Sequence, residues 1–250
     1  MNLIIDGNSI AHWKYHATKT AKPEDWAFGK QLWEVVNRWL WNLEKDLGQN
    51  NSKVTVCFDS RRNWRYDMYA SYKGQRPARD EDLYAQLDAL PTALNDNGWS
   101  SWLAEGFEAD DLCYALATEN AVVVSLDKDL CQLVSDERNV KVFSPRAGTM
   151  FDEAAVKAKF GVDAWRLREW LAICGDVADN IKGAPGWGEK TTTNGINETL
   201  DFEHLLTSAA ALKLTTVSER LQKNLAEWSD KLRLNYEITG FRAPENELPF

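Results

Sequence analysis

Short apolar runs alternate with longer segments of helical periodicity along the first two thirds of the chain. The short runs, which predict buried strands, lie at residues 2–5, 53–58, 99–103, 121–126 and 140–143. The segments with apolar residues three and four positions apart, which predict amphipathic helices, lie at residues 26–47, 81–94 and 108–118. Strands that alternate with helices predict a doubly wound, mostly parallel sheet with helices on both faces.

The pattern changes from about residue 164 onwards. Residues 164–174 and 212–228 have helical periodicity, and the last part of the chain is mostly helical with polar faces. We therefore expect an α/β domain at residues 1–163 and a helical subdomain at residues 164–250.

Acidic residues stand where predicted strands end or where the helix at 108–118 begins. They are Asp6, Asp59, Glu108, Asp110, Asp111, Asp127 and Asp129. We expect a tight turn after Asp6, with Ser9 as the cap of the next helix. In an open parallel sheet, strand ends and helix starts meet at one edge, where ligands bind. One such acid alone is usually a cap or a solvated side chain, but the whole set on one rim predicts a shared cationic partner.

Positive charge is concentrated in one region of an acidic chain. The net charge of −9 argues against nucleic-acid binding by overall charge. Residues 61–79 nevertheless interleave cations with aromatic rings: Arg61, Arg62, Trp64, Arg65, Tyr66, Tyr69, Tyr72, Lys73, Arg76 and Arg79. This mixture suits a strand of nucleic acid, with cations for phosphates and rings for stacking. A solvated connection with no partner is the alternative.

A glycine-rich segment follows the helix at 164–174. Asp176 and Asp179 are three positions apart, a spacing that would let them share one face of a helix. Residues 183–191, GAPGWGEKT, then place three glycines around a proline. Such a turn exposes backbone N–H groups that bind phosphate; a plain helix–helix turn is the alternative. The tract at 191–195 is a poor helix former, which predicts a short following helix.

Cysteine spacing and hydropathy indicate the compartment. The four cysteines are scattered with no CxxC spacing, as in reduced cytosolic proteins. The first apolar run ends at Asp6, and no later run approaches membrane-spanning length. We expect a cytoplasmic protein with no signal peptide and no membrane contact. His12 and His16 have a spacing compatible with metal binding, but no acid completes the set, so we interpret them as an ordinary helix face.

Six blocks of this sequence, in order, resemble the structure-specific 5′-nucleases: the flap endonucleases, the phage 5′-exonucleases and the 5′-nuclease domains of bacterial DNA polymerases. The blocks are LIIDGNS at 3–9, VCFDS at 56–60, YKGQRP at 72–77, FEADD at 107–111, SLDKD at 125–129 and GDVADNIKGAPGWGEKT at 175–191. The resemblance implies a PIN-like sheet domain, an arch or lid at about residues 65–97, and a C-terminal helix–turn–helix clamp on duplex DNA.

The resemblance also implies two divalent cations. The first would be held, directly or through water, by Asp6, Asp59, Glu108, Asp110 and Asp111. The second would be held by Asp127, Asp129, Asp176 and Asp179, with Asp110 or Asp111 shared. Because every ligand is an oxygen, Mg²⁺ or Mn²⁺ is expected rather than zinc.

The DNA contacts follow from the same resemblance. Lys73 and Arg76 match the family's basic catalytic residues, and Tyr72 would stack on a terminal base. The residues expected to bind DNA are Arg65, Tyr72, Arg79, Gly183, Gly186, Gly188, Lys190 and Thr191. In some members the equivalent of the Gly183–Gly188 turn holds K⁺ through backbone carbonyls, which makes K⁺ a candidate ion here.

The resemblance thus implies a monomeric 5′-3′ exonuclease or flap endonuclease that acts on DNA with 5′ ends, flaps or nicks. RNA in RNA–DNA hybrids is a further candidate substrate. A PIN-type ribonuclease shares the sheet and the acidic rim, although the glycine-rich clamp and the basic stretch argue against it. A junction-binding protein with degraded catalysis is a second alternative, and the intact acidic set argues against that. A phosphatase with its nucleophile at Asp127 or Asp129 is a weaker third.

Overall fold

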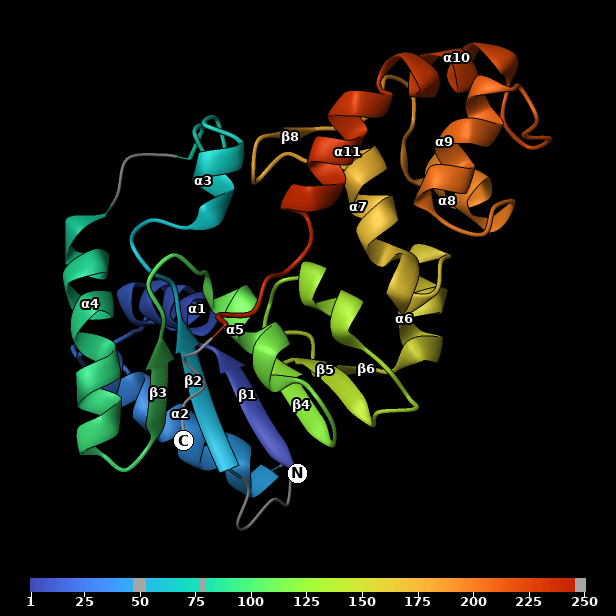
Figure 1. Ribbon diagram of the computed structural model, residues 1–250. Helices are drawn as coiled ribbons and strands as arrows, with labels where there is room; N and C mark the ends of the chain where they lie inside the picture. The colour runs from blue at the N-terminus through green and yellow to red at the C-terminus, as the bar shows by residue number, and fades with distance from the viewer. Residues whose placement is uncertain (47–52, 77–79, 246–250) are drawn as a thin grey trace.

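A twisted six-stranded sheet forms the larger part of the molecule (Figure 1). The computed structural model describes residues 1–46, 53–76 and 80–245. The strand order is β3-β2-β1-β4-β5-β6. The strands are β1 (Asn2–Asp6), β2 (Lys53–Phe58), β3 (Ser100–Leu103), β4 (Ala121–Val124), β5 (Val140–Ser144) and β6 (Thr149–Phe151). The pairs from β3 to β5 are parallel, which confirms the predicted sheet, and β6 pairs antiparallel with β5.

Helices cover both faces of this sheet because its central strands are apolar on both sides. On β1, Leu3 and Ile5 pack with one set of helices, whereas Ile4 packs on the opposite side. The first set is α1 (Gly7–Lys19), α2 (Leu32–Asp46) and α4 (Glu81–Asp96). The opposite face is covered by α5 (Ala109–Leu116), the 3₁₀ helix η1 (Asp129–Leu133), α6 (Glu153–Phe160) and α7 (Leu167–Cys174).

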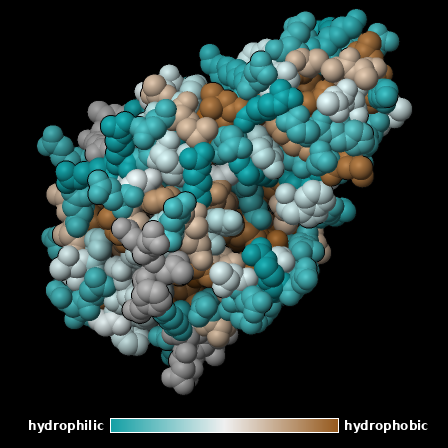
Figure 2. Space-filling model, viewed as in Figure 1, coloured by the Kyte–Doolittle hydropathy of each residue, from teal (hydrophilic) through white to brown (hydrophobic). Residues whose placement is uncertain are grey.

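The C-terminal part forms a helical lobe beside the sheet, at the upper right of Figure 1. After the short η2 (Ala164–Arg166), its elements are β7 (Gly175–Asp176), β8 (Ile181–Lys182), α8 (Glu189–Asn197), α9 (Phe202–Ala210), α10 (Glu219–Glu227) and α11 (Ser229–Ile238). One apolar cluster runs from Ile4 in the sheet through Leu171 to Leu232 in the lobe, so the two parts share a core. Hydrophilic side chains cover most of the face seen in Figure 2, and apolar ones show in scattered patches. No helix within the described ranges is long and apolar enough to cross a membrane.

Several predicted elements differ in detail from the structure. No tight turn follows β1: α1 begins at Gly7, and Asp6 is its cap, because its carboxylate accepts a hydrogen bond from Ser9 N (3.0 Å). The helices predicted from residues 26 and 212 begin at Leu32 and Glu219. Asp176 does not share a helix face with Asp179, because it lies in the β7–β8 hairpin.

The tract at 191–195 is helical despite its low helix propensity, in a helix of nine residues. It lies inside α8, where Thr192 and Gly195 are buried. A Cβ on Gly195 would lie 2.7 Å from the ring of Trp187, so a side chain here would displace the tryptophan. Close packing against Trp187 therefore outweighs the low helix propensity of this tract.

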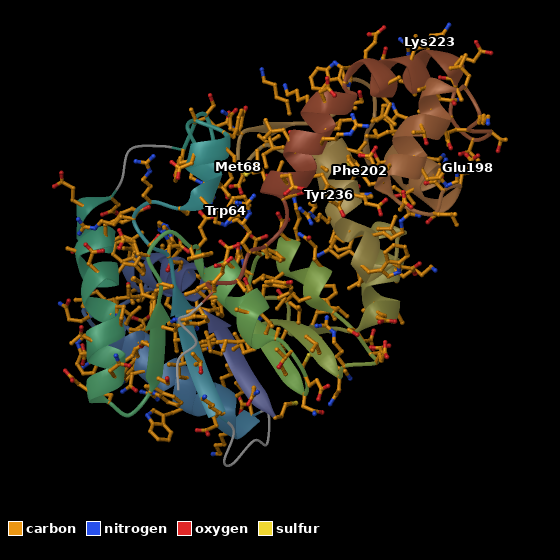
Figure 3. The ribbon with its side chains drawn as sticks, viewed as in Figure 1. Trp64, Met68, Glu198, Phe202, Lys223 and Tyr236 are labelled. Atoms are coloured by element: carbon orange, nitrogen blue, oxygen red, sulfur yellow. The ribbon has the colours of Figure 1, made fainter. Side chains whose placement is uncertain are left out.

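Arg65 joins three elements that are distant in sequence. It lies in α3 (Trp64–Met68), whose Trp64 and Met68 are labelled in Figure 3, and is 3% exposed. Its guanidinium donates two hydrogen bonds to the Asp111 carboxylate (2.8 and 3.0 Å) and one to Glu108 Oε2 (3.0 Å), both at the start of α5. It also donates to the carbonyls of Ile238 (3.0 Å) and Gly240 (2.8 Å), at the end of the helical lobe.

Replacement of Arg65 tests this junction. Arg65→Met keeps the bulk of the side chain but leaves Asp111 buried without its countercharge, so we expect a loss of about 3–5 kcal/mol in the free energy of unfolding. Arg61→Met is the control, because Arg61 pairs with Asp88 while 83% exposed and should cost less than about 1 kcal/mol. Urea denaturation measures both, and equal losses would contradict the proposed role of Arg65.

Candidate active site

Acidic side chains from four separate stretches line one cleft at the carboxyl edge of the sheet. The cleft has a volume of about 1100 Å³. Its acidic lining is Asp6, Asp59, Glu108, Asp110 and Asp127, together with Asp88 of α4. β1 pairs with both β2 and β4, which brings together the strand ends that are followed by Asp59 and Asp127. The strand topology therefore produces the predicted convergence of these acids on one rim.

A second, smaller cavity of about 250 Å³ adjoins the first. It is lined by Asp127, Asp129, Asp176 and Asp179. Asp127 lines both cavities, and so does Arg76. Apart from Asp111, which lines neither cavity, the two sets of acids that the sequence suggested for two cations thus lie in neighbouring cavities that share Asp127.

Burial and mutual repulsion raise the pKa values of several of these carboxyls above their ordinary values. Burial raises the pKa of Asp6 to about 7, and hydrogen bonds from the Ser125 hydroxyl (2.5 Å) and Ser9 N only partly offset it. Burial and the charge of Glu108 raise the pKa of Asp59 to about 6. Burial and neighbouring acids also raise the pKa of Asp110 and Asp129 well above the usual range. This crowding is the condition that a bound cation relieves.

The donor set fits a hard divalent cation. Every acidic group in the two cavities offers carboxylate oxygen, the ligand that Mg²⁺ and Mn²⁺ prefer. Asp129 Oδ1 is buried and has no hydrogen-bond partner among the described residues. An unpartnered buried carboxylate oxygen is costly unless something positive reaches it.

The side-chain orientations of the acids are set by their present ion pairs. Within the described residues, no group of three or more Asp, Glu, His or Cys side chains is arranged as a ready metal site. Three of the acids are instead held in ion pairs: Lys73 with Glu108 (2.5 Å), Arg76 with Asp179 (2.8 Å) and Lys128 with Asp176 (3.1 Å). Cation binding through Glu108, Asp176 or Asp179 therefore requires these side chains to turn away from their present partners.

Lys73 lies in the first cavity with its ammonium almost buried. Burial lowers its pKa, but the charges of Glu108, Asp179 and Asp59 outweigh burial and keep the pKa above the ordinary value. Its backbone has a φ of 53°, a costly conformation for a residue with a side chain. The backbone N–H of Lys73 donates to the carbonyl of Asp179 (3.1 Å), which holds this conformation in place.

The structure corrects the predicted role of Arg65 and of Asp111. Arg65 is buried and all its contacts are internal, so it does not reach DNA as predicted. Asp111 is fully buried, and its oxygens accept from Arg65, Trp64 Nε1 (3.1 Å) and the backbone N–H groups of Glu108 (3.1 Å) and Arg242 (3.0 Å). Because its acceptor positions are filled, Asp111 orients α5 and is not a cation ligand.

Tyr72 also differs from its prediction. Its ring is 2% exposed, so it cannot stack on a terminal base. Its hydroxyl lies 2.9 Å from Glu108 Oε2 and 2.9 Å from Asp179 Oδ2, and so links the two groups of acids. The sequence offered no signal for this contact. Arg79 lies outside the described residues.

The glycine-rich turn leads directly into α8. Gly183 allows a close approach, because a Cβ there would lie 2.2 Å from the carbonyl oxygen of Cys174. Gly186 has a φ of +81°, and Gly188 is the cap residue of α8 with no side-chain cap hydrogen bond. Lys190 is exposed and Thr191 is half-buried in the first turn. The start of α8 therefore presents backbone N–H groups with a cation beside them, as an anion site requires.

The cleft includes residues that the sequence interpretation left aside. His12 and His16 of α1 line it, together with Tyr84 and Pro91 of α4. The spacing of the two histidines indicated a shared helix face. The sequence did not show that this face lines a cleft, because α4, which lines the cleft with it, is distant in the sequence. The cleft thus extends well beyond the acids.

The pH dependence of stability tests the raised pKa values. Unfolded carboxyls titrate near pH 4, whereas Asp6 and Asp59 in the fold have pKa values of about 7 and about 6. Between these limits the folded protein holds more protons than the unfolded chain, so its stability falls as pH rises through the window. We expect the free energy of unfolding in EDTA to decline from about pH 4 to pH 7, less steeply in Asp59→Asn. A flat profile in urea denaturation would contradict the raised values.

Comparison with known proteins places residues 1–244 in one family. Residues 1–161 match the family described as 5′-3′ exonuclease, N-terminal resolvase-like domain, and residues 162–244 match 5′-3′ exonuclease, C-terminal SAM fold. Flap endonuclease Xni of Cronobacter sakazakii is 31% identical over 212 residues, 81% of this chain and 79% of that protein. DNA polymerase I of Pseudomonas aeruginosa is 35% identical over 201 residues, 76% of this chain but 21% of the polymerase, so the chain spans about a fifth of that protein.

Solved structures agree on the fold. The T5 D15 protein co-crystallised with metal ions superposes with a TM-score of 0.78 at 20% identity, over 96% of this chain and 89% of that one. Human GEN1 in complex with Holliday junction DNA gives a TM-score of 0.64 at 17% identity, over 100% of this chain and 62% of that one. On the family match and the relative of similar length, the chain belongs to the 5′-3′ exonuclease family.

Proposed function

We propose that the chain is a divalent-metal-dependent nuclease that hydrolyses phosphodiesters at the 5′ ends or 5′ flaps of DNA. The observation that carries this proposal is the pair of adjoining acidic cavities that share Asp127, with Lys73 and Arg76 beside them. The relatives support the substrate class, because one is named a flap endonuclease and a T5 D15 structure is described as a complex with DNA and metal ions.

The proposed cofactor is Mg²⁺ or Mn²⁺, with two ions. Asp6, Asp59, Glu108 and Asp110 would hold one, and Asp129, Asp176 and Asp179 the other, with Asp127 between them. When bound, such a pair activates water and stabilises charge on the phosphodiester. A T5 5′-exonuclease structure contains zinc, but the all-oxygen donor set of this chain favours the harder ions.

Lys73 and Arg76 stabilise the negative charge that builds up on the phosphate during cleavage. Both are now paired with acids of the candidate ligand set, Glu108 and Asp179. When those acids turn toward a cation, the two side chains become free to contact phosphate oxygens. The same exchange of partners keeps the local charge balanced with and without substrate.

The helical lobe supplies the proposed duplex contact. The turn from Gly183 to Gly188 and the start of α8, with Lys190 and Thr191, would hold the phosphate backbone. K⁺ at this turn, RNA in RNA–DNA hybrids as a second substrate, and a monomeric state are parts of the same proposal. A cytoplasmic location is supported by the free thiols of all four cysteines.

A catalytically weak junction-binding protein is the second candidate. It is favoured by one observation, that the described acids form no ready-made metal site. It predicts tight binding of branched DNA with no cleavage in Mg²⁺, whereas the nuclease predicts both.

Lys73→Ala tests the proposed catalysis. We expect the rate of 5′-flap cleavage in Mg²⁺ to fall about 100- to 1000-fold, because one charge-stabilising donor is lost, while flap binding in EDTA changes little. Lys157→Ala is the matched control, because Lys157 is also ion-paired, with Asp163 (2.8 Å), but lies outside both cavities. Single-turnover cleavage and fluorescence anisotropy give the two quantities. Equal losses of rate and affinity would make Lys73 a phosphate contact without a catalytic role.

A further inference from the structure

The turn that follows α3 lies against the β7–β8 hairpin (Figure 1). The Tyr69 hydroxyl donates a hydrogen bond to the backbone carbonyl of Asn180 (3.1 Å). The backbone N–H of Lys73 donates to the carbonyl of Asp179 (3.1 Å). These contacts hold the chain on both sides of Tyr72, so the position of the Tyr72 side chain is fixed relative to the hairpin.

The Tyr72 side chain lies between the two sets of acids. Its ring packs edge-to-face against that of Tyr66, with 5.4 Å between the ring centres. Its hydroxyl lies 2.9 Å from Glu108 Oε2 and 2.9 Å from Asp179 Oδ2. Glu108 lines the larger cavity and Asp179 the smaller one, whereas Tyr72 lines neither of the two. The hydroxyl therefore acts on a ligand of either cavity only through these two carboxylates.

One hydroxyl hydrogen faces two carboxylate oxygens. A phenol has a single O–H donor, and a carboxylate can only accept. Tyr72 therefore donates to Glu108 or to Asp179 at any one moment, and the other carboxylate oxygen then faces the hydroxyl oxygen with no hydrogen between them. Two negative groups beside one donor also repel each other. The arrangement is thus relieved when one of the two acids turns away.

The two acids depend on Tyr72 to different extents. Glu108 Oε2 also accepts a hydrogen bond from the buried Arg65 guanidinium (3.0 Å). Asp179 Oδ2 has no hydrogen-bond partner other than Tyr72 within the described ranges of the chain. Asp179 Oδ1 accepts from Arg76 (2.8 Å), whose side chain is 52% exposed. Tyr72 is therefore the buried group that holds Asp179 in its present orientation.

Cation binding changes how many acids the hydroxyl can serve. In the proposed pair of ions, Glu108 turns to one ion and Asp179 to the other. When one site alone is filled, the Tyr72 hydroxyl donates to the acid that stays. When both are filled, the hydroxyl has lost both of its present acceptors, and a buried donor without an acceptor is costly. The second ion to bind therefore bears a cost that the first does not.

We propose that Tyr72 is a positioning residue whose hydroxyl couples the two cation sites, so that occupation of either site opposes occupation of the other. This inference rests on the proposed function, which gives Glu108 and Asp179 to different ions. The coupling needs the hydroxyl hydrogen and not the ring, because only the hydroxyl contacts the acids. Removal of the hydroxyl should therefore release the opposition and leave every acid in the chain.

The test measures the binding of Mn²⁺ alone to the protein without DNA. Isothermal titration calorimetry gives the two dissociation constants, and the electron paramagnetic resonance signal of free Mn²⁺ counts the bound ions. Tyr72→Phe removes the hydroxyl and keeps the ring. Tyr72→4-fluorophenylalanine is the second variant, because fluorine fills the space of the hydroxyl without a hydrogen and leaves no room for water.

Tyr69→Phe is the matched control. It also removes a hydroxyl that donates to the β7–β8 hairpin, but this hydroxyl donates to a backbone carbonyl and not to an acid. Urea denaturation of all four proteins reports any loss of folding. A loss of packing weakens both binding steps together, so it does not change the ratio of the two dissociation constants.

We expect the wild-type protein to bind two Mn²⁺ ions in two steps of different affinity. In both variants at Tyr72 the ratio of the two dissociation constants should fall about 5- to 150-fold, the equilibrium factor for one buried donor without an acceptor. The ratio in Tyr69→Phe should equal that of the wild-type protein.

Two results would overturn the inference. One needs no variant: a wild-type protein that binds both ions with equal affinity, or that binds only one. The other is a ratio in the variants at Tyr72 that matches the ratio in Tyr69→Phe. Cleavage of 5′-flap DNA by the wild-type protein in Mg²⁺ is measured in parallel. Cleavage with an unchanged ratio leaves the proposed function standing without this coupling. A changed ratio with no cleavage of any DNA contradicts the proposed function alone.

Discussion

The structure depends on the crowding of carboxylates at one edge of a parallel sheet. β1 lies between β2 and β4, so the three strands end next to one another. The carboxylates of Asp6, Asp59 and Asp127 are therefore brought close together. Two kinds of positively charged side chain offset this repulsion. Arg65 is buried and bound on every side, so its pairing with Asp111 is permanent. Lys73 and Arg76 border the cavities and are each held by one carboxylate, so those pairs are open to exchange. Access to the cleft thus separates Asp111, which builds the fold, from acids such as Asp6 and Glu108, which are also buried but line the cleft.

The same compensation assembles the molecule. The segment that carries Arg65, Tyr72 and Lys73 is folded against the acids and is not a free basic arm. Arg65 also binds the carbonyls of Ile238 and Gly240, which ties the helical lobe to the start of α5. The lobe that we propose to hold duplex DNA is therefore fixed relative to the acidic cleft by the side chain that neutralises Asp111.

The sequence predicts the strands and the acidic rim well because both follow from local pattern. Strand ends fall where apolar runs stop, and parallel pairing then decides which acids are neighbours. It predicts poorly the partners of individual charges. The residues near Arg65 and Asp111 in the sequence do not show whether the two form a buried structural pair or whether Arg65 contacts DNA and Asp111 binds a cation. That depends on residues distant in the sequence: Asp111 is 46 positions from Arg65, and Ile238 is 173 positions from it. For a similar reason, the sequence does not show what holds the short α8 together: the close contact of Gly195 with Trp187 outweighs the low helix propensity. The extension of the cleft along α1 depends on the distant α4.

The most direct test of the account is cleavage of DNA by the unmodified protein, with 5′-labelled and 3′-labelled flap, nicked and single-stranded substrates in Mg²⁺ and in EDTA. The account predicts short 5′ products in Mg²⁺ and none in EDTA. It also predicts that Asp127→Asn with Asp129→Asn lowers the rate more than about 100-fold in a protein that still folds. The exposed pair Asp136→Asn with Glu137→Gln should leave the rate unchanged. Tight binding of the flap with no cleavage at any Mg²⁺ concentration would contradict the account.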